Sequence, residues 1–588
     1  MSRPNDNDDT KDSLLEIAQR HAVPIISLLL ECQDATVKPA KYTKYIERLS
    51  VFSPGTTKRT RAPGGECSKR YLNHRPIDAN EDRNYVAVSY TWRPAEDEID
   101  DEAQPRTYLI QRGQTGHYED SPVRDATFMR SIRYMRNVRA GSFWLDQHSI
   151  EQETECKEHN CGHMSCIKKK EAIFAADLVY RQSSYPVRLL RRVMTSALEL
   201  RLLCDLLENK LTRVEHFQDG PFFSVVPEKQ RDAESTLQLL TYIARDLWWT
   251  RAWTYQEHYR GGSRMELLMR HKPSLEAEKR RLNVFGCIEG ELQFGFSDFS
   301  TRATMLCLAL SSRFPNRRTG GEREESIKSM LAALGRYAVL LDESQAMSAT
   351  IIADVNARGL QNPSDRLDIV ANCCQYSLRV DWQKLRHSDH HGASLSAALM
   401  AQYLINGEIM YNGEYSKRYA RNIATLPVDQ ALRCLSFDMF QAPLEEAGRS
   451  WSHNKRCRFF EPVMTETGVK TKGHLWELGT TIHTAGVRWT ESWVNDPRAD
   501  LTLECCRTLM WLSYELESRN CRELPEELRQ FVQAGYEQGK FSDAYMCTMA
   551  MEVCDAIKEG KRLTLGRLWQ RDEFPVAYSA IFILDDQV

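Results

Sequence analysis

Residues 85–90 read Tyr-Val-Ala-Val-Ser-Tyr, a run rich in β-branched and aromatic residues. Such a run is typical of a β-strand, because branched and aromatic side chains pack well on a pleated sheet. Two later runs have the same character: Ser-Phe-Trp-Leu-Asp at residues 142–146 and Pro-Val-Arg-Leu-Leu at residues 186–190. Each of the three runs predicts a strand.

Stretches with helical spacing of apolar residues follow these strands. Residues 122–139 place Phe128 and Ile132 on one side of a helix, and residues 168–180 and 195–208 also fit helices. Regular alternation of strand and helix is the pattern of a parallel sheet flanked by helices. We therefore expect an α/β N-terminal domain built on a parallel sheet.

The pattern changes near residue 275. A helix at residues 231–248 and a strand at residues 265–269 end the α/β part, and the remainder is expected to be a mainly α-helical C-terminal region. The strongest helix candidates there are residues 324–341, 395–404, 501–518 and 542–558. The predicted division is an N-terminal tail and helical segment at 1–80, the α/β domain at 81–275, and the helical region at 276–588.

Turn-forming residues mark two further segments. The Pro, Gly and Thr content of residues 53–65 predicts a loop. The turn-rich stretch at residues 466–473 predicts a small hairpin or loop.

Charge and hydropathy exclude several classes of protein. The chain has 588 residues and a formal net charge of -3, from 78 basic and 81 acidic side chains. Near-neutral charge without a basic stripe disfavours binding to nucleic acid. No stretch approaches the roughly 20 apolar residues of a membrane span, and the polar start lacks the features of a secretory signal. We expect a cytoplasmic location, with the nucleus left open.

Three short segments resemble one known family. They are Tyr-Val-Ala-Val-Ser-Tyr-Thr-Trp at residues 85–92, Phe-Trp-Leu-Asp at 143–146 followed by Ile-Glu-Gln at 150–152, and Arg-Ala-Trp-Thr-Tyr-Gln-Glu at 251–257. Their order and spacing are similar to those of the fungal heterokaryon-incompatibility (HET) domain. One departure is Arg93, which stands where the family has a glycine after the first segment's tryptophan.

The resemblance implies a function and a more specific fold. Members of the family are linked to incompatibility reactions when genetically different fungal cells fuse. Their domain is thought to be distantly related to Toll/interleukin-receptor (TIR) domains, which implies a flavodoxin/TIR-like sheet. Some TIR domains assemble as scaffolds and others cleave NAD. The expected partner is another protein of the incompatibility pathway or a second copy of this chain.

The motif residues are expected to meet at one edge of the sheet. Ligands of open parallel sheets bind at the carboxyl ends of the strands, where Ser89 and Asp146 lie. Glu257 is the candidate carboxylate that would stabilise an oxocarbenium-like state if NAD is the substrate. The candidate catalytic residues are Glu257, Asp146 and Ser89, and the candidate ligand-binding residues are Tyr90, Trp92, Gln152, Arg251, Trp253 and Gln256.

A purely structural role is the alternative for the same residues. The tryptophans of the motifs, Trp92, Trp144 and Trp253, are of a type that more often fills cores than holds ligands. Asp146 and Gln152 have the chemistry of capping residues. Arg251 and Glu257 could form a buried ion pair that fixes a loop.

A group of cysteines and histidines lies between the second strand and its helix. Thiolate and imidazole are the ligands that zinc prefers, and a structural zinc site needs four. The spacing is tighter than in a two-pair zinc finger, so a Cys- and His-rich loop without metal, or a redox-sensitive pair of Cys156 and Cys161, are the alternatives. The candidate metal ligands are Cys156, His159, Cys161, His163 and Cys166.

Three functions are consistent with these patterns. The first is an incompatibility signalling protein that recognises non-self and triggers regulated cell death by self-assembly of its HET domain. The second is a TIR-like NAD glycohydrolase that uses Glu257. The third is a nucleic-acid or regulatory factor that uses the candidate metal loop, which the charge of the chain disfavours.

Overall fold

The structure is a computed structural model with two compact units. It describes residues 8–38, 43–62, 65–92, 107–112, 116–152, 163–217, 220–311, 321–334, 351, 354–386, 393–408, 425–434, 459–473, 475–484, 503–538, 544–569 and 578–584. Unit 1 comprises residues 1–213, 223–443 and 462–470, and unit 2 comprises residues 214–222, 444–461 and 471–588.

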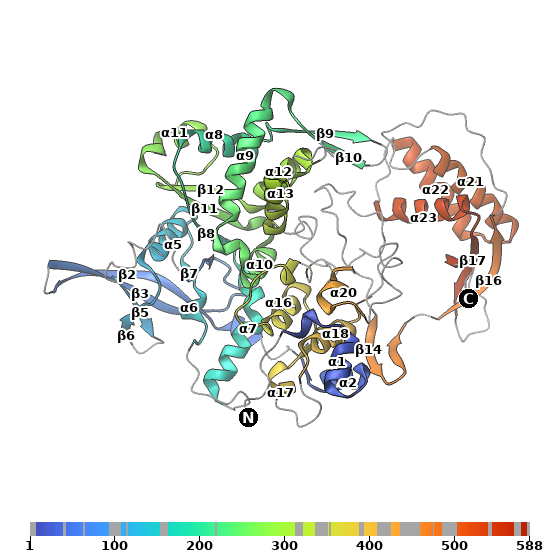
Figure 1. The fold of residues 1–588 in the computed structure, drawn as a ribbon, viewed down its shortest axis with the longest axis horizontal. Helices are drawn as coiled ribbons and strands as arrows, with labels where there is room; N and C mark the ends of the chain where they lie inside the picture. Colours follow the sequence, from blue (N-terminus) through green and yellow to red (C-terminus); the bar gives the residue numbers. More distant parts are fainter. Residues whose placement is uncertain are drawn as a thin grey trace. The chain divides into compact units, whose positions relative to one another are not determined.

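A mixed β-sheet forms the centre of unit 1 (Figure 1). Within the described residues it has nine strands, in the order β12-β11-β8-β4-β7-β2-β3-β5-β6. The strands are β2 (Leu49–Ala62), β3 (Gly65–Ile77), β4 (Tyr85–Ser89), β5 (Tyr108–Arg112), β6 (His117–Asp120), β7 (Ser142–Trp144), β8 (Val187–Met194), β11 (Glu266–His271) and β12 (Glu291–Gly295).

The strands predicted from the sequence make the parallel part of this sheet. β4 pairs in parallel with β7 on one side and with β8 on the other, and β11 pairs in parallel with β8. The chain therefore continues from β4 to β7 on one side of β4, and then to β8 and β11 on the other side. The strand order reverses between β4 and β8. Such a reversal leaves a crevice at the carboxyl ends of the two strands, because the connections on either side run in opposite directions.

The remaining strands make the sheet mixed, whereas a parallel sheet was expected. β2 and β3 form a long antiparallel hairpin that extends as an arm in Figure 1. The prediction of a loop at residues 53–65 was wrong. Pro54 and Gly55 produce a register shift between Pro54 and Thr57 rather than ending the strand, and the Thr-rich continuation keeps its pairing. A bulge and a loop share the same turn-forming residues.

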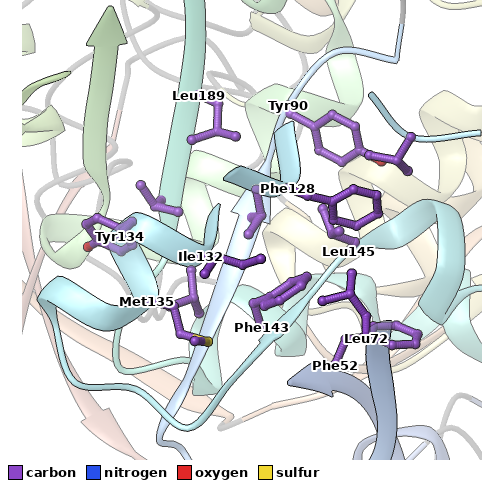
Figure 2. Close-up of a cluster of buried hydrophobic side chains, with 14 of the residues drawn as sticks. Phe52, Leu72, Tyr90, Phe128, Ile132, Tyr134, Met135, Phe143, Leu145 and Leu189 are labelled. Carbon is purple, nitrogen blue, oxygen red and sulfur yellow. The ribbon is translucent and has the colours of Figure 1, made fainter. Parts of the chain in front are cut away.

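Helix α5 (Asp125–Asn137) covers one face of the sheet. Its Phe128, Ile132 and Met135 point toward the strands in Figure 2, where they meet Phe143 of β7 and Leu189 of β8. Successive strand residues point to opposite faces. Alternate residues of β4 therefore belong to this hydrophobic core, and the residues between them must face the other side.

Helices α7 (Met164–Gln182) and α10 (Ala252–Gly261) cover that other face. The Tyr85 hydroxyl donates to the Val179 carbonyl of α7 over 2.7 Å. The ring of Trp144 packs edge-on against Tyr180 of α7, with 5.7 Å between ring centroids. The alternation along β4 thus directs Tyr85, Ala87 and Ser89 toward α7 and α10.

Further helices of unit 1 lie outside this layer. Some begin as the sequence indicates: Ser196 and Glu199 form a capping box at the start of α8. These helices are α1 (Leu14–His21), α2 (Ile25–Asp34), α3 (Thr43–Glu47), α6 (Asp146–Ser149), α8 (Ala197–Leu207), α9 (Gln230–Ala244), α11 (Glu276–Leu282), α12 (Phe296–Ser311), α13 (Gly321–Leu334), α16 (Asp365–Cys374), α17 (Trp382–Arg386), α18 (Leu395–Ile405) and α20 (Val428–Cys434). The first residues described contact α18, because Asp9 accepts the Ser396 N–H at the start of that helix over 2.9 Å.

Unit 2 combines helices with a small sheet. Its helices are α21 (Leu503–Ser518), α22 (Glu523–Gln538) and α23 (Ala544–Lys558), and its sheet consists of β16 (Trp476–His483), β17 (Arg562–Leu568) and β18 (Ala580–Leu584). A mainly helical character was expected, and the antiparallel sheet adds to it. The small hairpin predicted around residues 466–473 is confirmed as β14 (Phe460–Thr465) and β15 (Gly468–Lys472), and its residues 462–470 belong to unit 1.

Short two-stranded pairings complete the described structure. β1 (Thr36–Val37) pairs with β13 (Arg379–Val380), and β9 (Thr212–Phe217) pairs with β10 (Gly220–Val225). In the described part of the chain, every helix is too short or too polar to cross a membrane.

A buried ion pair connects α5 to three strands of the sheet. Arg130 Nε lies 2.6 Å from Glu291 Oε1 and Arg130 Nη2 lies 2.9 Å from Glu291 Oε2, so the pair is bidentate. The guanidinium also donates to the carbonyls of Leu190 in β8 and Leu268 in β11, over 2.7 and 2.9 Å. Both charged side chains are buried, so each depends on its partner.

We predict that Glu291→Gln lowers the free energy of unfolding by about 3–5 kcal/mol, because it leaves the Arg130 charge buried without a counter-charge. Urea unfolding followed by tryptophan fluorescence measures this loss. Glu119→Gln is the matched control, since its partner Arg112 is 61 % exposed, and it should cost about 1 kcal/mol or less. Equal losses in the two variants would contradict the assignment.

Candidate functional site

The site lies where β4 and β7 end, beside the reversal of strand order. Ser89 is the last residue of β4, and Asp146 begins α6, two residues after β7. Parallel strands present their carboxyl ends at the same edge of a sheet, so both side chains reach one edge. Helix α10 packs on the same face as Ser89 and brings Glu257 to it.

Ser89 joins two parts of this edge by hydrogen bonds. Its hydroxyl donates to Glu257 Oε2 and accepts from the indole N–H of Trp248, with 2.7 Å between Trp248 Nε1 and Ser89 Oγ. Trp248 belongs to the 3-10 helix η5 (Leu247–Thr250), which precedes α10. Ser89 is buried, and Glu257 is partly buried.

Asp146 accepts hydrogen bonds from Trp92 and from the backbone of Gln147. The exposed Trp92 donates its indole N–H to Asp146 Oδ2 over 2.9 Å. The backbone N–H of Gln147 donates to Asp146 Oδ1 over 2.7 Å. The Tyr90 hydroxyl donates to the side-chain oxygen of Gln147 over 3.1 Å. Aromatic residues after β4 therefore orient the turn that carries Asp146.

The charge of Asp146 affects the ionisation of Glu257. Burial raises the pKa of Glu257 to about 8, and the negative charge of Asp146 adds to the rise, while the hydrogen bond from Ser89 and the charge of Arg251 oppose it. Burial also raises the pKa of Asp146, against the hydrogen bond from Trp92. A nearby like charge disfavours ionisation of a carboxyl group.

This arrangement sets what the site can do chemically. At neutral pH most Glu257 side chains keep their proton, so Glu257 is suited to donate a proton to a leaving group. Burial also disfavours the charged form of Asp146, while the indole N–H of Trp92 favours it. The ionised, oxocarbenium-stabilising role expected for Glu257 does not fit a carboxyl group that keeps its proton.

Arg251 and Gln152 lie near this edge. Arg251 precedes α10 as its N-cap residue, and its charge lowers the pKa of Glu257 and of Asp146. Within the described residues no close ion pair joins Arg251 to Glu257. The side-chain amide of Gln152 donates to the Asp146 carbonyl over 3.2 Å and to the Ile150 carbonyl over 3.0 Å, which shapes the turn.

Two candidate ligand-binding residues point elsewhere. Trp253 donates its indole N–H to Asp365 of α16 over 3.0 Å. Gln256 is fully buried, and its side-chain oxygen accepts from Asn372 of the same helix over 3.0 Å. Both side chains therefore connect α10 to α16 by hydrogen bonds. Trp144, which the structural alternative assigned to a core, is buried in the sheet.

The residue pattern missed three members of the site. Tyr180 of α7 contributes a hydroxyl that lowers the pKa of Glu257. Trp248 donates to Ser89, and Arg188 of β8 lies against the Trp248 ring. The aromatic run at residues 248–253 marks Trp248 in the sequence. Arg188 stands inside a strand-like run, with no local feature that indicates its burial.

The candidate metal loop is only partly within the described structure. Cys156, His159 and Cys161 lie outside the described residues. His163 precedes α7 and Cys166 lies in the first turn of that helix. Among described residues no three His, Cys, Asp or Glu side chains form a group suited to a metal ion. Zinc binding by the loop therefore stays a prediction.

Comparison with known families identifies the segment that carries this site. Residues 85–257 match the family model described as Heterokaryon incompatibility protein (HET). The segment is a HET domain. The match confirms the resemblance seen in the three motifs, and it begins at the first residue of β4 and ends at Glu257. Searches of curated proteins and of solved structures each returned no match.

We predict that Glu257→Gln stabilises the protein increasingly as the pH rises. The folded HET domain keeps the Glu257 proton up to about pH 8, whereas the unfolded chain loses it near its usual pKa of 4.5. Folding therefore weakens with rising pH across this interval. Glutamine still accepts from Ser89 but has no proton to lose, so the gain should grow by about 1.4 kcal/mol for each pH unit, to roughly 5 kcal/mol by about pH 8, and then level off.

Thermal unfolding of wild type and variant at a series of pH values measures this gain. Glu228→Gln is the control, because Glu228 is an exposed carboxylate of the same domain. A gain from Glu257→Gln that is the same at every pH would be incompatible with a raised pKa of Glu257.

Proposed function

We propose that this chain is a heterokaryon-incompatibility signalling protein, which recognises non-self and triggers regulated cell death. One observation carries the proposal: the HET match spans residues 85–257, and this segment contains Ser89, Asp146, Trp248 and Glu257, which meet at one edge of the sheet. The segment that defines the family and the segment that builds the site are therefore the same.

We further propose that the HET domain has a flavodoxin/TIR-like sheet and acts by self-assembly. The order of the parallel strands supports the fold: numbered along the chain, β4, β7, β8 and β11 lie as 2-1-3-4, the order of doubly wound sheets of the flavodoxin type. In this proposal a cue from another protein of the incompatibility pathway releases assembly of the domain.

A TIR-like NAD glycohydrolase is the second candidate, and the carboxyl pair is the observation that favours it. Glu257 keeps its proton near neutral pH and would serve as a general acid, and Asp146 is a second carboxyl group near it; cleavage of a glycosidic bond uses two such groups. The family match does not itself favour this activity, so the hypothesis of a glycohydrolase depends on the carboxyl pair alone.

Expression of the full chain in a fungal host tests the two candidates together. We expect induction of the wild-type chain to arrest growth and kill the cells, and Glu228→Gln to behave as wild type because Glu228 is exposed on the same domain. Viability and cellular NAD are measured in parallel over the first hours, for wild type, Glu228→Gln and Glu257→Gln at matched protein levels.

The pattern of results separates signalling from enzymatic killing. Death without loss of NAD, retained in Glu257→Gln, is the result expected for signalling by assembly. Early loss of NAD that Glu257→Gln reduces by about 100-fold or more, as for removal of a catalytic group, would favour the glycohydrolase. Survival of cells that express the chain and are fused with cells of a genetically incompatible strain would contradict an incompatibility function.

A further inference from the structure

A buried arginine lies directly beside Ser89 in the sheet. Arg188 of β8 is the Cα partner of Ser89 in the parallel pairing with β4. Side chains at paired positions of neighbouring strands point to the same face. Arg188 therefore faces α7 and α10, as Ser89 does, and it is fully buried.

Two tryptophan rings stack on the Arg188 guanidinium. The guanidinium carbon lies 3.3 Å from the centroid of Trp248 and 3.4 Å from that of Trp249. Within the described residues, none of its three nitrogens has a hydrogen-bond partner. Burial lowers the pKa of Arg188 well below its usual value, while the charge of Asp246 opposes this. The faces of the indole rings thus supply the close electrostatic contacts of this cation.

The two tryptophans differ in where their indole N–H groups point. Trp248 donates to Ser89 Oγ over 2.7 Å, whereas Trp249 donates to the Ile243 carbonyl over 3.0 Å. Both rings contact Arg188 almost equally. One ring is therefore connected to the site and the other is not, which provides a matched pair for experiment.

Ser89 connects Trp248 to Glu257 through two hydrogen bonds. A serine hydroxyl has one hydrogen, and because Ser89 accepts from Trp248, that hydrogen is free to donate to Glu257. A cation over the ring face withdraws electron density from the indole and strengthens its N–H as a donor. Hydrogen bonds in such a chain polarise one another, so the effect extends to the carboxyl group.

We propose that Arg188 is a positioning residue that acts through Trp248 and Ser89 to favour the ionised form of Glu257. Other groups act on Glu257 from the elements packed around it: Asp146 from α6, Arg251 from the start of α10 and Tyr180 from α7. The charge of Arg188 also acts on Glu257 directly, beside the relay. Asp146 disfavours ionisation, whereas Arg251 and Tyr180 favour it. The relay from Arg188 adds a buried contribution from β8 that solvent ions do not screen.

This inference deepens the proposed site, since it names the group that regulates its central carboxyl. It does not require that the protein kill cells or cleave NAD. The experiment therefore measures proton binding by Glu257 in the purified full chain, and its failure is distinct from failure of the proposed function.

Infrared titration of the full chain labelled with 13C-glutamate is the measurement. The protonated-carboxyl band that disappears in Glu257→Gln reports Glu257, and its loss with rising pH gives the midpoint. Trp248→Phe keeps a ring against Arg188 and removes the donor to Ser89. Trp249→Phe makes the same change on the other ring, and Arg188→Met removes the charge while keeping a long apolar side chain.

We expect Trp248→Phe and Arg188→Met each to tighten proton binding by Glu257 by about threefold to tenfold, because each weakens a hydrogen bond to the ionised form. Trp249→Phe should leave the midpoint unchanged. Equal shifts in the two tryptophan variants, or none in Trp248→Phe, would overturn the proposal, because packing alone treats the two rings alike.

Ser89→Ala keeps the test decisive if Trp248→Phe folds poorly. Ser89→Ala should itself raise the midpoint, and adding Trp248→Phe to it should then produce no further shift, since the connection is already broken. Additive shifts of the two changes would refute the relay. Near-ultraviolet circular dichroism at a fixed pH checks that each variant retains the packing of its tryptophans.

Discussion

The alternation of side chains along β4 is the constraint on which the rest of unit 1 depends. Because neighbouring residues of a strand point to opposite faces, Val86 and Val88 join the hydrophobic core under α5, whereas Ser89 turns toward α10. A shift of one residue in the pairing of β4 would exchange these faces. It would place a hydroxyl against α5 and remove the partner of Glu257, so core and site are fixed by the same register.

Much of the sheet and of its edge could be predicted from the sequence. The runs at β4, β7 and β8 are strongly apolar, and the edge at which Ser89 and Asp146 meet follows from parallel pairing. The hairpin of β2 and β3 could not be recognised, because Pro54 and Gly55 predict a turn whether they end a strand or produce a bulge in it. The charged middle of that hairpin likewise gives no alternation to follow.

The assignment of ligand-binding residues on α10 shows a second limit. The motif at residues 251–257 places Gln256 next to Glu257, but successive residues of a helix are about 100° apart, so the two side chains point in different directions. Trp253 and Gln256 bond α16, and Glu257 bonds Ser89. Which face meets the sheet depends on α16, whose position is a tertiary contact. Arg188 poses the same difficulty, since its burial requires two tryptophans about 60 residues away in the chain.

The position of β11 shows that the folded domain extends beyond the segment that the family model matches. The family match stops at Glu257, yet β11 begins at Glu266 and lies inside the sheet between β8 and β12. A fragment cut at the family boundary would expose the whole pairing edge of β8 and would remove Glu291, the counter-charge of Arg130. Unpaired edges of this kind template aggregation. The segment that the family model matches is therefore shorter than the segment needed to complete the sheet.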